Sequence, residues 1–144
     1  MTATADSGTE LGGDLQERRS KIRQREILLK WEQWGPAYRH VAGDSLGYVC
    51  EIVDATDDER AWLRKHVAEN GMPDGAGRSA EEWYALRREQ GRQANAAASA
   101  AFLSGAYDRA RDLIDDALAH GSLLETEWVR LHHFISARVA ERPA

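Results

Sequence analysis

The sequence predicts an all-α protein, a small helical domain of five or six helices. Two observations lead to this fold class. The 144 residues include 23 alanines but only 16 valines, isoleucines and threonines together, a composition that favours helices over sheets. Apolar side chains also recur at helical spacing, and residues that favour helix starts stand before several of these runs.

Cysteine content and charge exclude several classes of protein. Cys50 is the only cysteine in the sequence, which excludes a disulfide framework and a cysteine-based zinc site. No apolar run reaches the ~20 residues of a membrane helix, and the polar, acidic start does not resemble a signal peptide. We therefore expect a cytoplasmic protein with no cofactor and no membrane contact. The net charge of −5 argues against a chain that mainly coats nucleic acid.

The chain is expected to form one folded domain with a tail. Residues 1–13 are polar, contain glycine and lack periodicity, which is typical of a disordered tail. A single helical domain is predicted over residues 14–144. It comprises N-terminal helices over 14–70, a loop over 71–78 and a second group of helices over 79–142.

The first helix is expected to begin at Asp14, a good N-cap residue with Glu17 three positions later. The sequence Gly35-Pro36 is expected to interrupt or kink it. Three large aromatic residues near its end share one face: Trp31, Trp34 and Tyr38. Core packing is the ordinary role of such residues, but together they exceed what one helix normally buries. They are therefore candidates to line a groove for a ligand or partner.

A narrow apolar seam of Leu15, Ile22 and Leu29 runs along the same helix at seven-residue spacing. This spacing is typical of a helix that packs on a partner helix, so a homodimer is predicted. The alternative is a first helix that folds back on its own chain. The only basic cluster flanks the seam: Arg18, Arg19, Lys21, Arg23, Arg25 and Lys30. A solvated helix face is the ordinary interpretation of this cluster, and it is favoured over contact with nucleic acid.

Helix-start signals locate the next elements. Residues 46–53 have apolar side chains at helical spacing, which favours a helix over a lone strand. Thr56 with Glu59, and Ser79 with Glu82, have the spacing of capping boxes. Gly71 is expected to end the helix that starts at Thr56.

From Gly105 the chain reads GAYDRARDLIDDAL, with Tyr107 and Ala110 following at fixed spacing. This segment resembles the tetratricopeptide repeat, in which G-x-Y-x-x-A marks the turn into the second helix. Trp128 and Leu131 resemble the W-x-x-L pair of a following first helix, one period of about 34 residues along. The resemblance covers roughly residues 90–140 and implies a helical hairpin at the C-terminal end. A plain helical bundle is the alternative.

In this family the first helices of the repeats form a groove. The resemblance therefore implies a groove lined by Arg92, Asn95, Ser99 and Phe102. The function that it implies is a non-catalytic module that binds a protein or peptide. Two alternatives stand beside it. One is a small helical enzyme or accessory protein that binds a small molecule in an aromatic pocket with a histidine. The other is a regulator that contacts nucleic acid through the basic first helix.

His132 and His133 are the most conspicuous polar pair. Adjacent residues of a helix point about 100° apart, so the pair cannot bind one metal ion from one face. We therefore expect no metal site. His132 is retained as a candidate for partner or ligand contact, whereas general-base catalysis is the less favoured role for this pair.

Overall fold

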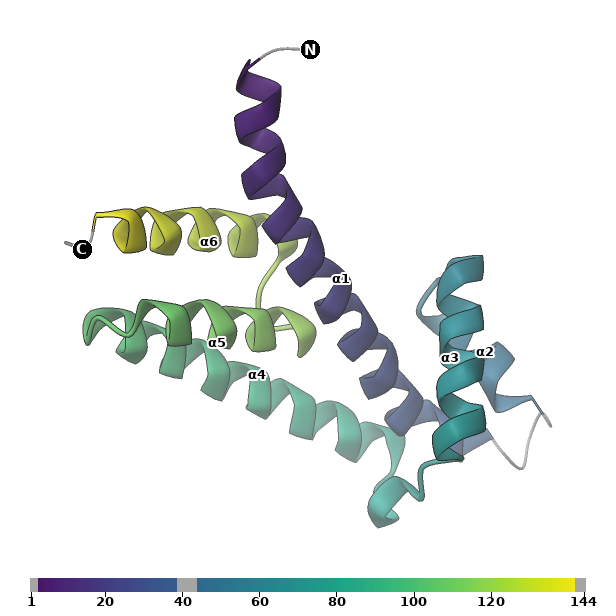
Figure 1. Cartoon of the computed structure of the whole chain (residues 1–144). Coiled ribbons are helices and arrows are strands. Elements are labelled where there is room, and N and C mark those ends of the chain that lie inside the picture. Colours follow the sequence, from purple (N-terminus) through teal and green to yellow (C-terminus); the bar gives the residue numbers. More distant parts are fainter. Residues whose placement is uncertain (1–2, 39–43, 142–144) are drawn as a thin grey trace. The chain divides into compact units, whose positions relative to one another are not determined.

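The computed structural model confirms the all-α prediction. Its described residues, 3–38 and 44–141, form six α-helices and contain no strand (Figure 1). The helices are α1 (Ala3–Tyr38), α2 (Ser45–Ile52), α3 (Asp57–Asn70), α4 (Ala80–Leu103), α5 (Tyr107–Ala119) and α6 (Glu125–Ala140). A 3₁₀ turn, η1 (Gly75–Gly77), lies inside the predicted loop 71–78.

The first helix begins earlier than the sequence predicted, at Ala3 and not at Asp14. Once a helix has nucleated, each further residue adds a hydrogen bond, so extension toward the N-terminus costs little. Residues 1–2 of the predicted tail lie outside the described residues, as do the side chains of 3–13. Pro36 does not end the helix but lies in its last turn, and the helix ends two residues later, at Tyr38.

The two capping boxes that the sequence predicted are confirmed. Thr56 and Glu59 form both bonds of a capping box, with Thr56 N–H donating to Glu59 Oε1 at 2.9 Å and Glu59 N–H donating to Thr56 Oγ1 at 3.1 Å. Ser79 and Glu82 form the same reciprocal pair, at 3.0 and 3.2 Å. These bonds satisfy backbone N–H groups that have no partner within the helix.

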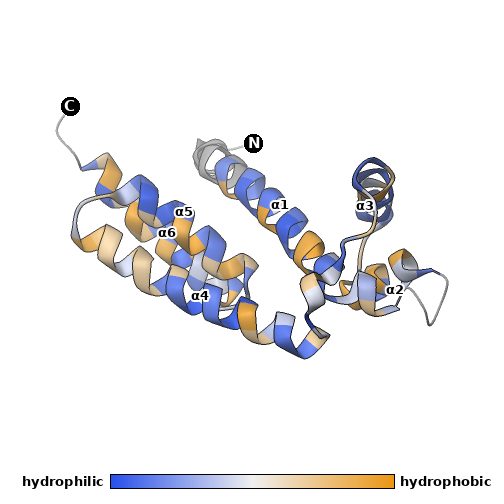
Figure 2. Cartoon of the chain, turned by 90° about the horizontal axis from the view of Figure 1, so that it is seen from below, coloured by the Kyte–Doolittle hydropathy of each residue, from blue (hydrophilic) through white to orange (hydrophobic). Residues whose placement is uncertain are grey.

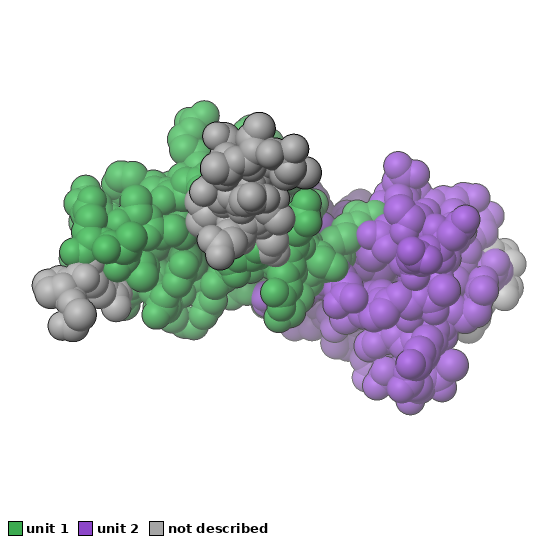
Figure 3. Space-filling view, turned by 45° about the horizontal axis from the view of Figure 1, so that its top comes forward, with its two compact units in different colours: residues 1–23, 87–144 green, residues 24–86 purple. Residues whose placement is uncertain are grey.

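The chain divides into two compact units (Figure 3). Unit 1 contains residues 1–23 and 87–144, and unit 2 contains residues 24–86. α1 and α4 therefore each contribute residues to both units. The prediction of a single domain over residues 14–144 stays a prediction, because it depends on whether the units unfold together.

Unit 2 is built around the second half of α1. Its core contains five buried residues: Ile27, Trp31, Val49, Cys50 and Leu63. They come from α1, α2 and α3, so the helix predicted over residues 46–53 is present and supplies two of them. The Asp44 carboxylate accepts a hydrogen bond from the N–H of Gly47 and caps α2.

Unit 1 contains the beginning of α1, most of α4, and the antiparallel pair α5 and α6 (Figure 1). Small residues allow its helices to approach closely. Ala110 and Ala117 of α5 are fully buried, and a Cβ added at Gly91 of α4 would lie 2.1 Å from Ser122 Oγ. Trp128 of α6 is also buried, at 2% exposure.

Gly105 lies in the turn between α4 and α5 with a φ of +83°. L-residues other than glycine avoid this region because Cβ crowds the backbone. A side chain there would meet nothing within 4 Å, so backbone strain should be the only cost of a substitution. We expect Gly105→Val to lower the free energy of unfolding by about 1–2 kcal/mol. Urea denaturation measures this, and a neutral result would contradict the turn assignment.

Ala110 tests the packing of α5. Its side chain is fully buried, and larger residues inserted into a packed core force neighbours out of position. We expect Ala110→Leu to destabilise by about 1–3 kcal/mol. The same substitution at the exposed Ala106 provides the control, and it should change stability by less than about 0.5 kcal/mol. Equal effects at the two positions would show that α5 is not packed as described.

The apolar seam of α1 is partly covered by the chain itself. Ile22 is 3% exposed, whereas Leu15 and Leu29 are half-buried. This burial matches the alternative in which the first helix folds back on its own chain. The homodimer through the seam stays a prediction. Sedimentation of the intact chain tests it, and a monomer across the accessible concentration range would contradict it.

Candidate functional site

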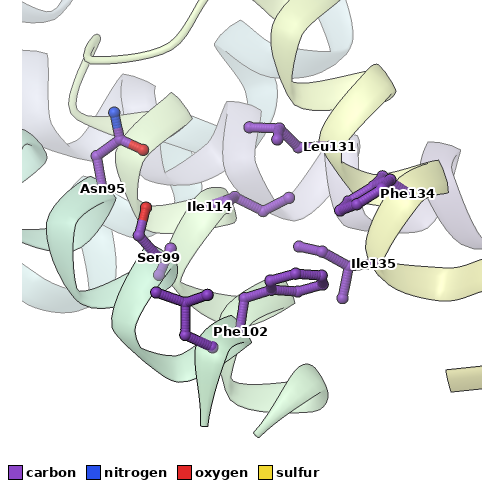
Figure 4. A pocket seen from close by; sticks show the side chains of 9 residues that line it. Asn95, Ser99, Phe102, Ile114, Leu131, Phe134 and Ile135 are labelled. Carbon is purple, nitrogen blue, oxygen red and sulfur yellow. The ribbon is translucent and has the colours of Figure 1, made fainter. Parts of the chain in front are cut away.

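An apolar pocket of about 250 Å³ lies in unit 1 among α4, α5 and α6 (Figure 4). We call it the apolar pocket. Its lining residues are Asn95, Ala98, Ser99, Phe102, Leu103, Ile114, Leu131, Phe134 and Ile135. Figure 4 shows Asn95 and Ser99 on one side, Phe134 and Ile135 on the other, and Ile114 between them.

Helical periodicity brings these residues together. On α4, Asn95, Ser99 and Phe102 are four and three positions apart and therefore share one face. On α6, Leu131, Phe134 and Ile135 follow the same spacing. α5 contributes Ile114, which is 2% exposed.

Large apolar side chains are exposed at the pocket. Leu103 is 84% exposed and Phe134 is 49% exposed. The Phe102 ring packs against two aromatic neighbours, with centroids 5.2 Å from Phe134 and 5.3 Å from Tyr107. Exposed apolar side chains beside a preformed cavity are typical of a binding surface.

Two polar side chains border the pocket on α4. Asn95 is half-buried and Ser99 is exposed. Within the described part of the chain, neither side chain has a hydrogen-bond partner. Both are therefore available to a bound molecule. Asn95 can donate and accept, and the Ser99 hydroxyl can do the same.

The structure brings together three of the four groove residues that the sequence implied. Asn95, Ser99 and Phe102 line the pocket. Arg92 is not among its lining residues, and its guanidinium is paired with the Glu89 carboxylate. The contributions of α5 and α6 were missed, because the spacing of Leu131, Phe134 and Ile135 in the sequence indicates that they share a helix face but not what that face contacts.

The aromatic residues of α1 lie in unit 2, where they contact other residues of that unit. Trp31 is 2% exposed within the core. Trp34 stacks on Tyr38, with centroids 5.7 Å apart, and Tyr38 stacks on Tyr48 at 4.9 Å. Packing therefore accounts for Trp31, and a stacked cluster accounts for Trp34 and Tyr38.

His132 does not line the apolar pocket. It is 1% exposed and packs beside Trp128, with ring centroids 6.0 Å apart. Its Nε2 lies 3.5 Å from Asp14 Oδ2, and its Nδ1 lies 3.4 Å from Ser136 Oγ. Burial, followed by the charge of Arg18, lowers the pKa of His132 to about 4. The imidazole is therefore neutral at pH 7 and shielded from substrates, so its position does not favour a catalytic role.

A partly buried ion pair lies beside this histidine, and no local pattern in the sequence indicates it. Arg18 of α1 donates from Nη1 to Asp115 Oδ2 of α5 at 2.7 Å. The Trp128 Nε1 of α6 donates to the other oxygen of Asp115 at 2.8 Å. Burial raises the pKa of the Asp115 carboxyl, whereas these two donors oppose that rise. The two bonds to Asp115 together connect three helices of unit 1.

Arg19, the next residue of the basic cluster, donates to Glu125 of α6 at 2.8 Å. Arg18 and Arg19 are therefore both paired with acids of α5 and α6. This pairing leaves less of the cluster available for phosphate groups than the sequence suggested.

Unit 2 contains a second cavity, of about 370 Å³. It lies beside the loop 71–78, and polar groups at its wall bond to one another. Gln33 Nε2 donates to the carbonyl oxygen of Ala80 at 2.9 Å, and Trp83 Nε1 donates to that of Gly75 at 3.2 Å. The first bond joins α1 to the start of α4, and the second holds the loop against α4, so both have a structural role.

Three further kinds of site are not indicated. Cys50 is buried, and burial raises the pKa of its thiol, which disfavours the reactive thiolate. The described residues contain no group of three histidine, cysteine or acidic side chains placed to hold a metal ion. Among the helices described, none combines the length and the apolar character that crossing a membrane requires.

Comparisons with known proteins gave no relatives: no protein-family model matches the chain, and no match was found among curated proteins or solved structures.

Proposed function

We propose that the chain is a non-catalytic module that binds a segment of another protein, and that the apolar pocket of unit 1 is its binding site. We also propose that α4, α5 and α6 form a tetratricopeptide-like arrangement of helices. In such an arrangement α4 and α6 are the first helices of successive repeats, and both border the pocket. A cytoplasmic location belongs to the same proposal.

The observation that carries this proposal is the pocket itself. The resemblance implied a groove along α4, and three of the four implied residues line a cavity with exposed apolar side chains. Further support comes from the turn between α4 and α5, where Gly105 has a positive φ. Buried Ala110 and Ala117 lie at the positions where the repeat requires small residues.

The size and composition of the pocket favour a side chain over a cofactor as its occupant. Pockets for small molecules usually have volumes of roughly 300–1,000 Å³, whereas this pocket has about 250 Å³. Seven of its nine lining residues are apolar, and no charged residue lines it. One or two apolar side chains from a partner therefore fit it better than a charged cofactor.

The proposal is tested with labelled synthetic peptides that carry phenylalanine, leucine or methionine at one central position, measured by fluorescence polarisation. Ser99→Trp should abolish binding, because Ser99 is exposed at the pocket and an indole there would cover it. Ala97→Trp is the matched control, since Ala97 is an exposed residue of α4 that does not line the pocket.

Exposed leucines provide a second matched pair. Leu103→Ala should weaken binding, whereas Leu124→Ala should not, because Leu124 is 68% exposed but does not line the pocket. If no peptide binds, or if Ser99→Trp has no effect, the proposed function is wrong.

A further inference from the structure

The charges beside the apolar pocket are unevenly distributed between its two walls. α6 places Arg130, Phe134 and Arg138 at four-residue spacing, so the three residues share one face of the helix. Phe134 lines the pocket. Two arginines therefore flank the exposed aromatic residue of this wall.

Both arginines are accessible to a partner. Arg130 is exposed and, within the described part of the chain, has no ion-pair partner. The Arg138 guanidinium lies over the Phe134 ring, 5.4 Å from its centroid. It also forms a 3.4 Å ion pair with Glu141, in which the two side chains are 47% and 66% exposed. Such a pair contributes little stability in water, so a partner carboxylate can replace it.

The opposite wall carries no charge. From Gln93 to Leu103, α4 contains no Asp, Glu, Lys or Arg, and the end of α4 that leads into α5 is white to orange in Figure 2. Its polar groups at the pocket are the Asn95 amide and the Ser99 hydroxyl, which can bond a peptide backbone. The pocket thus combines an apolar centre, one neutral polar wall and one cationic wall.

We propose that the occupant is an acidic peptide segment in which a large apolar residue is flanked by glutamate or aspartate. The apolar side chain enters the pocket, the backbone meets Asn95 and Ser99, and the flanking carboxylates pair with Arg130 and Arg138. This inference rests on the proposed function and adds the chemistry of the partner. The net charge of the chain is −5, which opposes an acidic ligand at long range. A measured preference for the acidic peptide would therefore have to come from the charges beside the pocket.

The test uses three labelled peptides with one shared apolar centre, flanked on both sides by glutamates, serines or lysines. We expect the glutamate-flanked peptide to bind the intact chain most tightly. The double variant Arg130→Glu with Arg138→Glu should weaken that binding about tenfold, the effect of losing two exposed ion pairs. The same variant should strengthen binding of the lysine-flanked peptide.

Arg109→Glu is the control, because Arg109 is an exposed arginine of α5 that does not line the pocket. It should leave all three affinities within about twofold of the wild type. The inference is wrong if the serine-flanked or lysine-flanked peptide binds as tightly as the acidic one. It is also wrong if the acidic preference survives the double variant. If none of the three peptides binds, the proposed function fails as well, so the two failures are distinguishable.

Discussion

Asp115→Ala should lower the free energy of unfolding by about 2–4 kcal/mol. The substitution removes the acceptor of both the Arg18 guanidinium and the Trp128 indole N–H. Trp128 is 2% exposed, so its N–H cannot reach water. The Arg18 side chain is 23% exposed, and this partial solvation places the loss below that of a fully buried pair.

Asp112 provides the matched control for this prediction. Its carboxylate lies 3.5 Å from the same arginine, but its side chain is 64% exposed. Asp112→Ala should therefore cost less than about 1 kcal/mol. Asp115→Asn should fall between the two, because the amide oxygen can still accept from Trp128. Chemical denaturation of the three variants measures the order, and equal losses at positions 112 and 115 would contradict the role of burial.

Mild acid should destabilise the protein through His132. Burial lowers the pKa of His132 from 6.5 to about 4, so the folded state resists a proton that the unfolded state accepts. The part of the unfolding free energy that depends on a neutral His132 is fully present above pH ~6.5 and is lost as the pH falls toward 4. The difference between these pKa values corresponds to about 3 kcal/mol. Other groups near the ring are Arg18, Asp14, Arg111 and His133.

Replacing the histidine separates its effect from that of other titrating groups. His132→Asn should flatten the decline in unfolding free energy between pH 6.5 and 4, even if it lowers stability at pH 7 by leaving a cavity. The exposed neighbour provides the control, and His133→Asn should follow the wild-type pH dependence. A decline of unchanged steepness in His132→Asn would assign the acid sensitivity to other groups.

Local signals in the sequence predicted much of the fold. Thr56 with Glu59 and Ser79 with Glu82 specify helix starts through bonds over three positions, which a sequence displays directly. The α4 side of the pocket could also be predicted, because the repeat resemblance implied Asn95, Ser99 and Phe102 and their helical spacing places them on one face.

Features that depend on distant residues were not predicted. Arg18 and Asp115 are 97 positions apart, and no local pattern identifies such a pair. Trp31 was a candidate for a groove because its helical face is apolar, and only the packing of α2 and α3 makes that face a core. The pocket wall on α6 could not be assigned for the same reason, since periodicity identifies a face but not its neighbour.

The division of the chain into a continuous unit and an interrupted one has a consequence for synthesis on the ribosome. Unit 2 is complete once residue 86 has emerged, whereas unit 1 needs its first 23 residues together with those from Arg87 onward. The first part of α1 therefore cannot form its ion pairs from Arg18 and Arg19 until Asp115 and Glu125 have been synthesised. Joining segments so far apart requires closing a long loop, a slow step compared with forming local helices. Unit 2 should thus resist proteolysis on stalled nascent chains before unit 1 does, and the apolar surface of α5 and α6 should be the last to be covered.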